Sequence, residues 1–244
     1  MAAASQKPAV IIEESPRSAA AEAFRSLRTS LQFLGPEKTD AFVVTSPGPG
    51  EGKSTCAANL AVALARVGRH VLLVDADMRR PSIEERFRLG RVQGLSQLLV
   101  GQCGDEVIQE SGIDGLQVVA SGIIPPNPAE LLARVALDEA LVRWRAMFDH
   151  IIFDTPPVLP VTDAVVVSRK TRHALLVTRV ASTRDRGLRQ AVRLLREAGV
   201  DILGGIVNDI MPGHGGAYYG YYRGYAPEGT KGEERVETAM TPDV

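Results

Sequence analysis

The chain has 244 residues, 45% of them hydrophobic, and a formal net charge of −1 at pH 7. This length fits one α/β domain with a tail better than two full domains, and the near-neutral charge argues against a nucleic acid as partner. No apolar run approaches the roughly 20 residues that a membrane-spanning helix needs, and MAAASQKPAV lacks the pattern of a secretory signal. Cys56 and Cys103 follow no metal or disulfide spacing, so we expect reduced thiols of a cytosolic protein.

The first elements along the chain are a leader and a helix. Residues 1–17 are small, polar and proline-containing, which predicts a flexible leader. Residues 18–34 have the apolar spacing of a helix, which the pair Gly35-Pro36 ends. One face of this helix is apolar and consists of Phe24, Leu27, Leu31 and Leu34.

Apolar strands and helices then alternate as far as residue 208. Runs typical of buried strands are AFVVTS, HVLLVD, GLQVVAS, HIIFDT, RHALLVT and DILGGIVN. Helical patterns occur at residues 53–66, near 95–100, after the Asn127-Pro128 pair, at 137–147 and at 183–198. This alternation predicts an α/β fold with a mostly parallel sheet and helices on both faces. We expect one domain over residues 18–210 and a disordered tail over 211–244.

A glycine-rich loop lies between the first strand and the next helix. Its sequence, SPGPGEGKST, is typical of a phosphate-binding P-loop, although Pro47 stands where the full pattern has glycine. Backbone N–H groups of such a loop surround phosphate oxygens, and the positive end of the helix points at the anion. The expected ATP-binding residues are Gly48, Pro49, Gly50, Glu51, Gly52, Lys53, Ser54 and Thr55. Lys53 would bridge the β- and γ-phosphates, and the Ser54 hydroxyl would reach Mg²⁺.

Aspartates at two strand ends extend this site. Asp75 and Asp77 belong to VLLVDADMR, and Asp154 ends HIIFD. The carboxyl ends of parallel strands lie on the sheet edge that carries the P-loop. We therefore expect Ser54, Asp75 and Asp154 to hold Mg²⁺ or its waters. The expected catalytic residues are Lys53, Asp75, Asp77 and Asp154, one carboxylate taking the proton from an incoming hydroxyl.

Three features have a simpler alternative beside the functional one. Asp77 could pair only with Arg79. Asn208, which we include among the ATP-binding residues, could read the adenine edge or cap a turn. A row of arginines on residues 183–198 could bind a polyanion, but an apolar stripe on the opposite side favours a solvated amphipathic helix. The row consists of Arg186, Arg189, Arg193 and Arg196.

All five tyrosines of the chain lie in one eight-residue window, residues 218–225, within the segment GGAYYGYYRGY near the C-terminus. They are Tyr218, Tyr219, Tyr221, Tyr222 and Tyr225. Tyrosines used for packing would be scattered over core positions, whereas these alternate with glycines that cannot build a core. A sticky low-complexity segment is one interpretation. Beside a phosphate site, the cluster instead indicates phosphoacceptor hydroxyls and a kinase that acts on itself or on its own copies.

Together these motifs resemble the bacterial tyrosine kinases (BY-kinases) of capsule and exopolysaccharide synthesis. The family's Walker A, second Walker-like and Walker B motifs correspond to SPGPGEGKST, VLLVDADMR and IIFDTPP. The resemblance runs from about residue 22 to residue 225. It implies that Lys53 and Ser54 bind ATP–Mg²⁺ and that Asp75 supports magnesium and is the candidate base. Asp77 would assist, and Asp154 would be the Walker B carboxylate.

The resemblance also implies an assembly. The family carries a Glu-x-x-Arg-x-x-Arg helix that joins subunits into a ring, an octamer being one size, and this chain has Glu22, Arg25 and Arg28 in EAFRSLR. Without the family, Glu22 and Arg25 could be a surface pair at i,i+3. Phosphorylation would occur on the tyrosine cluster, within the ring and between subunits.

Partners and location follow from the same resemblance. The family is activated by a transmembrane polysaccharide co-polymerase, either fused or separate, and is reversed by a cognate tyrosine phosphatase. Because the chain starts at Met1 without a membrane span, we expect a separate activator, unless this is an excised domain. The kinase would be cytoplasmic and recruited to the inner face of the membrane.

A related group of ATPases is the main alternative. Partitioning and septum-placement ATPases carry an extra lysine near the start of the P-loop, where this chain has Gly48, and they lack a tyrosine tail. A nucleotide-dependent scaffold with little transferase activity is a further alternative. Both would bind ATP through Lys53, so phosphotyrosine rather than ATP binding separates them from a kinase.

Overall fold

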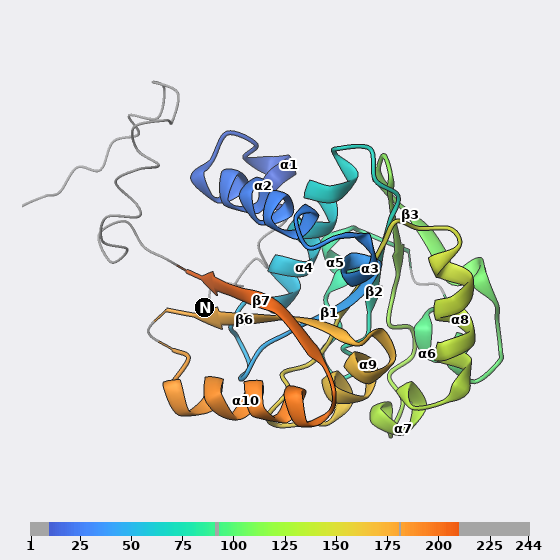
Figure 1. Cartoon of the computed structure of the whole chain (residues 1–244). Coiled ribbons are helices and arrows are strands. Elements are labelled where there is room, and N and C mark those ends of the chain that lie inside the picture. The colour runs from blue at the N-terminus through green and yellow to red at the C-terminus, as the bar shows by residue number, and fades with distance from the viewer. Residues whose placement is uncertain (1–9, 91–92, 181, 210–244) are drawn as a thin grey trace, which may run out of the picture. The chain divides into compact units, whose positions relative to one another are not determined.

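A seven-stranded sheet organises the molecule. The structure, a computed structural model, describes residues 10–90, 93–180 and 182–209 (Figure 1). The strand order is β3-β4-β2-β5-β1-β6-β7, and every neighbouring pair is parallel except β3 with β4. The strands are β1 (Ala41–Thr45), β2 (Val71–Asp75), β3 (Ile108–Ile113), β4 (Leu116–Val119), β5 (His150–Asp154), β6 (His173–Arg179) and β7 (Asp201–Asn208). The predicted α/β architecture is therefore confirmed.

Helices cover both faces of the sheet, as alternating apolar side chains of buried strands require. One core joins the sheet to α1 (Ile11–Glu14), α2 (Ala19–Gln32), α4 (Lys53–Ala65) and α5 (Ile83–Arg86). The other joins it to α6 (Leu95–Leu99), α7 (Pro128–Leu132), α8 (Val135–Arg145), α9 (Asp163–Thr171) and α10 (Asp185–Glu197). A short α3 (Pro36–Thr39) precedes β1, and a single 3₁₀ turn, η1 (Asp105–Val107), precedes β3.

The helix after the P-loop owes its position to small side chains. Residues 56–65, CAANLAVALA, are all buried, because alanines let α4 lie between the sheet and α2. Alanine also has the highest helix propensity. This packing fixes the N-terminus of α4, and with it Lys53, against the centre of the sheet.

The leader differs from its sequence-based expectation. Residues 10–17 are not flexible there: α1 forms, and Val10 and Ile12 are buried against α4. The Ile12 amide donates to Asn59 Oδ1 at 3.1 Å, and Asn59 Nδ2 donates to the Thr55 carbonyl at 2.9 Å. The apolar signal of AVII is too short for periodicity to reveal, so the prediction of a flexible leader is wrong for these residues.

Sequence periodicity did not predict two further elements, the helix α9 and the antiparallel edge strand β3. The tyrosines predicted to be phosphoacceptors and the rest of the tail lie outside the described residues. Among the helices that the structure describes, none combines the length and apolarity of a bilayer span.

Candidate functional site

The P-loop connects the end of β1 to the first turn of α4. Gly52 has φ +92°, in the left-handed region that glycine adopts without a side-chain clash. Within the loop, the Gly48 amide donates to Glu51 Oε2 at 2.8 Å, and Ser46 Oγ donates to the Gly48 carbonyl at 2.7 Å. Thr183 also donates its hydroxyl to the Glu51 carboxylate. Glu51 therefore holds the loop from inside, a role that the motif alone did not indicate.

Residues from the last two strands brace the same loop from the side. Asn208, at the end of β7, donates Nδ2 to the Glu51 carbonyl at 3.0 Å. Arg179, at the end of β6, donates Nη1 to the Gly50 carbonyl at 3.3 Å and pairs with Asp209 at 2.7 Å. The structure thus brings Asn208 to the predicted phosphate site, with its amide nitrogen used by the loop.

A methyl group at position 52 should disturb this arrangement. Its Cβ would lie 2.0 Å from Asn208 Nδ2, and the left-handed backbone costs a non-glycine residue about 1–2 kcal/mol. We expect Gly52→Ala to weaken ATP binding about tenfold or more, since small displacements of a site carry large penalties. Isothermal titration would measure it. Gly68→Ala is the matched control, because Gly68 has φ +79° but open space around its Cβ; it should lower stability and leave ATP affinity unchanged.

The strand-end carboxylates meet beside the loop. Asp75 of β2 and Asp154 of β5 are direct partners in the parallel register, and both are fully buried. Asp75 Oδ2 accepts the amides of Ser82 and Ile83, each at 3.0 Å, and its Oδ1 accepts the Asp77 amide at 3.2 Å. Asp75 thereby shapes the segment that follows β2. Burial and the negative charge of Asp154 raise the pKa of Asp75.

Asp154 is the unusual member of this pair. Neither of its carboxylate oxygens has a hydrogen-bond partner among the described residues, although both are buried. Burial raises its pKa, and the positive charge of Lys53 and the neighbouring Ser54 hydroxyl, which does not reach hydrogen-bond geometry, oppose the shift. An unbonded buried carboxylate fits a hard divalent cation, which prefers oxygen ligands. The described residues contain no group of three or more His, Cys, Asp or Glu that could hold a metal ion without further ligands.

Lys53 balances these charges. Its Nζ lies 2.8 Å from Asp77 Oδ2 and 3.3 Å from Ser54 Oγ. Burial favours the neutral amine, but the charges of Asp154 and Asp77 outweigh it and raise the pKa of Lys53. Asp77 Oδ1 accepts the backbone amides of Arg79 and Arg80, so both of its oxygens are used.

The alternative of an ion pair between Asp77 and the Arg79 side chain is wrong. The Arg79 guanidinium instead makes a bidentate pair with Asp163, with distances of 2.8 and 3.0 Å. Asp163 is fully buried at the first residue of α9. Sequence reasoning missed Asp163, Arg179 and Thr183. A possible signal for Asp163 was its place after TPPVLPVT, at the start of an apolar run.

The three residues of the predicted subunit contact lie on α2. Arg25 Nε donates to Glu22 at 3.0 Å, which is the i,i+3 pair, and its terminal nitrogens donate to the Pro16 carbonyl at 3.0 and 2.6 Å. Arg28 has a buried Nε without a partner among the described residues. Ile12, Glu13, Pro16, Arg25, Arg28, Ala63 and Arg66 line one groove there.

Comparison with known proteins gives a consistent set of relatives. Residues 43–194 match the family model described as AAA domain. The chain is 38% identical over 216 residues to tyrosine-protein kinase YwqD of Bacillus subtilis, covering 87% of this chain and 90% of that protein. It is 38% identical over 214 residues to the putative tyrosine-protein kinase EpsB of Ralstonia nicotianae, covering 85% of this chain but only 28% of that protein.

Solved structures agree with these relatives. The kinase domain of Escherichia coli tyrosine kinase ETK superposes with a TM-score of 0.81 at 34% identity, covering 89% of this chain and 86% of that one. The septum site-determining protein MinD of Pyrococcus horikoshii, complexed with Mg-ADP, gives 0.60 at 25% identity, covering 69% and 70%. The fold is thus that of P-loop nucleotide-binding proteins, and the match to the kinase domain extends over more of the chain.

Proposed function

The chain belongs to the bacterial tyrosine-protein kinase family, and from this we propose that it is an ATP-dependent protein-tyrosine autokinase. It phosphorylates its C-terminal tyrosine cluster and regulates the synthesis and export of a capsular polysaccharide or exopolysaccharide. The observation that carries the proposal is the arrangement of Lys53, Asp77 and the unbonded Asp154 at the N-terminus of α4. The chain covers about a quarter of the EpsB relative, so the activity of such longer proteins comes to it only as part of this proposal.

The proposed ATP site uses the P-loop and the strand ends. Backbone N–H groups from Gly50 to Thr55 surround the phosphates, with Gly48 and Pro49 completing the loop, and Lys53 exchanges Asp77 for phosphate oxygens. The Ser54 hydroxyl and the carboxylates of Asp75 and Asp154 would hold Mg²⁺, directly or through water. When bound, Mg²⁺ would supply positive charge to the phosphates during phosphoryl transfer. Mg-ADP in the MinD neighbour supports this choice of cofactors.

Asp75 is the proposed base for the acceptor phenol. Its raised pKa makes it a better proton acceptor than an ordinary carboxylate. Three backbone amides donate to its carboxylate and fix its orientation at the end of β2. Because the phenol pKa is near 10, alignment and late proton loss matter more than base strength. Asp77 assists by holding Lys53 until ATP arrives.

The tyrosines are within reach of such a site. The ten residues from Asn208 to Tyr218 extend at most about 33–36 Å. Four strand spacings separate β7 from β2, which is about 19–20 Å at 4.7–4.9 Å per step. Chain length therefore permits either a chain's own site or a neighbour's. The family's ring favours a neighbour's site.

Intact mass and phosphopeptide mapping test the proposal. The purified chain is incubated with ATP–Mg²⁺, with and without the cytoplasmic tail of a candidate membrane activator. Added phosphate on Tyr218, Tyr219, Tyr221, Tyr222 or Tyr225 supports the autokinase. ATP bound without any added mass, even with the activator, would instead favour a nucleotide-dependent scaffold or a positioning ATPase.

Removal of Arg28 is expected to weaken self-association. An Arg28→Ala chain loses the buried, unpartnered guanidinium edge on α2, and a central interface arginine often contributes more than 2 kcal/mol. The dissociation constant of the ring should rise at least about tenfold, measured by sedimentation velocity. Arg69→Ala, which removes an exposed arginine, is the control. Unchanged sedimentation of Arg28→Ala would refute the contact.

Phosphorylation itself should loosen the ring. Each phosphate adds about −1.5 to −2 charges, and the end of the tail is already acidic through Glu228, Glu233, Glu234 and Glu237. Equal sedimentation of phosphorylated and unphosphorylated protein would contradict this. A transmembrane co-polymerase as activator, a cognate phosphatase and recruitment to the inner face of the membrane complete the proposal.

A further inference from the structure

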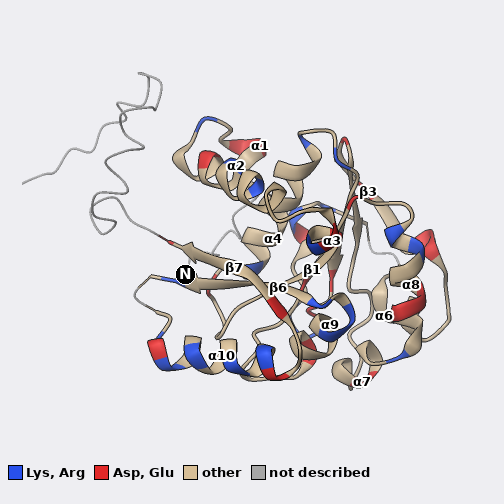
Figure 2. Cartoon of the chain, in the orientation of Figure 1, with Lys and Arg blue, Asp and Glu red and all other residues tan. Residues whose placement is uncertain are grey.

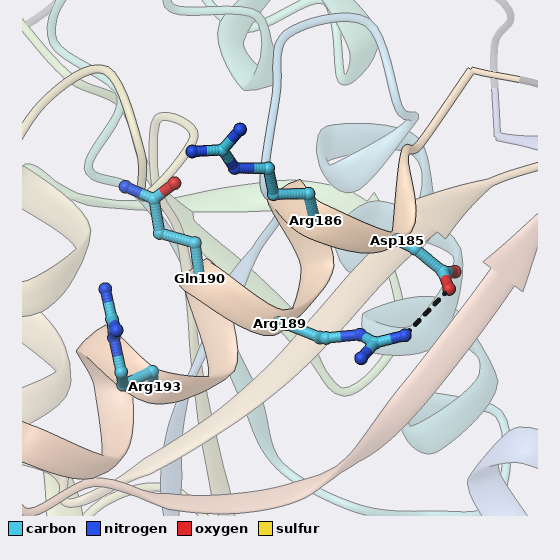
Figure 3. A pocket seen from close by; sticks show the side chains of 5 residues that line it. All are labelled: Asp185, Arg186, Arg189, Gln190 and Arg193. Atoms are coloured by element: carbon cyan, nitrogen blue, oxygen red, sulfur yellow. Dashed lines mark hydrogen bonds and ion pairs between the residues drawn. The ribbon is translucent and has the colours of Figure 1, made fainter.

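The outer face of α10 presents a row of guanidinium and amide donors. Arg186, Gln190 and Arg193 follow one another at i, i+4 and i+7 and point to the same side of the helix (Figure 3). We call these three residues the α10 row. They line a hollow together with Asp185 and Arg189, which pair with each other at 3.2 Å. The row is therefore an arranged set of donors on one surface.

The charge of this surface is not balanced within the part of the chain that the structure describes. Residues 184–197 contain five arginines and only two acidic residues, and blue ribbon segments recur along α10 in Figure 2. Arg186 has no ion pair among the described residues, and Arg193 has only a long contact of 3.8 Å with Glu197. The side chains of Arg189 and Arg193 are 82% and 71% exposed. Spare guanidinium groups remain available to an anion.

The helix does not need these arginines for packing. Ala191 and Leu195 are buried against the sheet, with Leu188, Val192 and Leu194 beside them, so α10 is anchored by its apolar stripe. Any polar side chain would be compatible with the solvent-exposed face of this helix. Guanidinium differs from other polar groups because its planar fork binds phosphate through two parallel hydrogen bonds. The row therefore fits a ligand with more than one phosphate.

The spacing of the row matches the tyrosine cluster. Arg186 and Arg193 are seven residues apart, or about 10.5 Å along the axis at 1.5 Å per residue. Tyrosines three residues apart lie on the same side of a polyproline II helix and are separated by about 9 Å at 3.1 Å per residue. The cluster contains three such pairs, namely Tyr218 with Tyr221, Tyr219 with Tyr222 and Tyr222 with Tyr225. Two phosphates on one pair would meet both arginines at once.

We propose that the α10 row binds the doubly phosphorylated tyrosine segment of another copy of this chain. The inference rests on the proposed function only for the source of the phosphates. It gives the reaction product a docking place on the helix, so that α10 distinguishes phosphorylated from unphosphorylated neighbours.

Synthetic peptides test this without any kinase activity. A labelled peptide of residues 216–227 carries phosphates on Tyr219 and Tyr222, and the receptor is the full chain with all five tyrosines changed to phenylalanine. Fluorescence anisotropy at 0.15 M salt measures affinity. We expect R186Q/R193Q to bind at least about tenfold more weakly than the parent receptor. R186K/R193K, which keeps the charge without the fork, should be intermediate.

Controls separate this site from general electrostatics. R134Q/R169Q removes two exposed arginines elsewhere and should bind like the parent. The unphosphorylated peptide should not bind, and phosphates on the adjacent Tyr218 and Tyr219 should bind several-fold more weakly. Equal affinity of R186Q/R193Q and R134Q/R169Q would overturn the proposal. The proposal would also be overturned if R186Q/R193Q lost binding to phosphatidylserine vesicles but bound the phosphorylated peptide as tightly as the parent. The row would then be a membrane-binding surface.

The outcome is independent of the mass experiment. If the peptide binds to a chain that does not phosphorylate itself, the docking site is supported and the autokinase proposal is refuted. If the chain phosphorylates itself but the phosphorylated tail does not bind the row, the autokinase proposal is supported and the docking site is refuted.

Discussion

A Lys53→Met chain is expected to lose tyrosine phosphorylation by at least about a hundredfold, the usual scale for removing a preorganised charge from a phosphoryl- or acyl-transfer site. Lys53 is the cation that contacts Asp77 and offsets the charge of Asp154. Methionine fills a similar volume but cannot neutralise phosphate oxygens. Phosphopeptide mapping of Tyr218–Tyr225 after incubation with ATP–Mg²⁺ measures the loss.

Lys38→Met is the matched control for this variant. Lys38 is exposed and lies 3.7 Å from Asp201, so its removal should leave phosphorylation within about twofold, since exposed pairs contribute little. Phosphate that persists on the tail of Lys53→Met would contradict the proposed site. A loss of equal size in both variants would point to a general effect of charge rather than to the P-loop.

Asp154→Asn is expected to raise the stability of the nucleotide-free protein while it abolishes phosphorylation. The carboxylate is buried without a hydrogen-bond partner, and a buried unsatisfied charged group costs on the order of 1–3 kcal/mol or more. Asparagine has nearly the same shape and no charge. Urea unfolding at pH 8 should therefore show a larger free energy of unfolding, with at least a hundredfold loss of phosphate transfer.

The stability of the protein should depend on pH in a direction that follows from the two raised carboxyl pKa values. Asp75 and Asp154 have folded-state pKa values raised by burial, so the folded state holds protons that the unfolded state has released. Stability then falls as pH rises from the ordinary carboxyl pKa, near 4, through the raised folded value. Asp154→Asn should make the decrease in stability with rising pH smaller. Asp185→Asn, at an 87% exposed side chain, should change stability by no more than about 0.5 kcal/mol. Equal unfolding curves for Asp154→Asn and the parent would refute the account.

The sequence predicts the position of those site residues that lie at the ends of strands or in the loop beside them. Lys53, Ser54, Asp75 and Asp154 could be predicted because a P-loop and apolar strands fix their common edge of the sheet. The direct register of Asp75 with Asp154 could not, since strand order is a tertiary property. Contacts such as Arg79 with Asp163 join residues 84 positions apart, and no local pattern signals them.

The leader illustrates the same limit on a smaller scale. Its apolar residues number too few for a period, and only packing against α4 reveals their role. Glu51 is similar: the motif predicts it only as one residue of the ATP-binding loop, yet its carboxylate also holds Gly48 and Thr183 together.

The short helix α1 has a mechanical consequence. The Ile12 amide is joined through the Asn59 side chain to the carbonyl of Thr55, which is the residue after Ser54. Glu13 adds an ion pair to Arg66 at the far end of α4. Through these contacts α1 is joined to α4 near both of its ends, and one of the contacts lies one residue from the hydroxyl that is proposed to meet magnesium. A displacement of α1 would therefore be transmitted to the helix that begins at the P-loop.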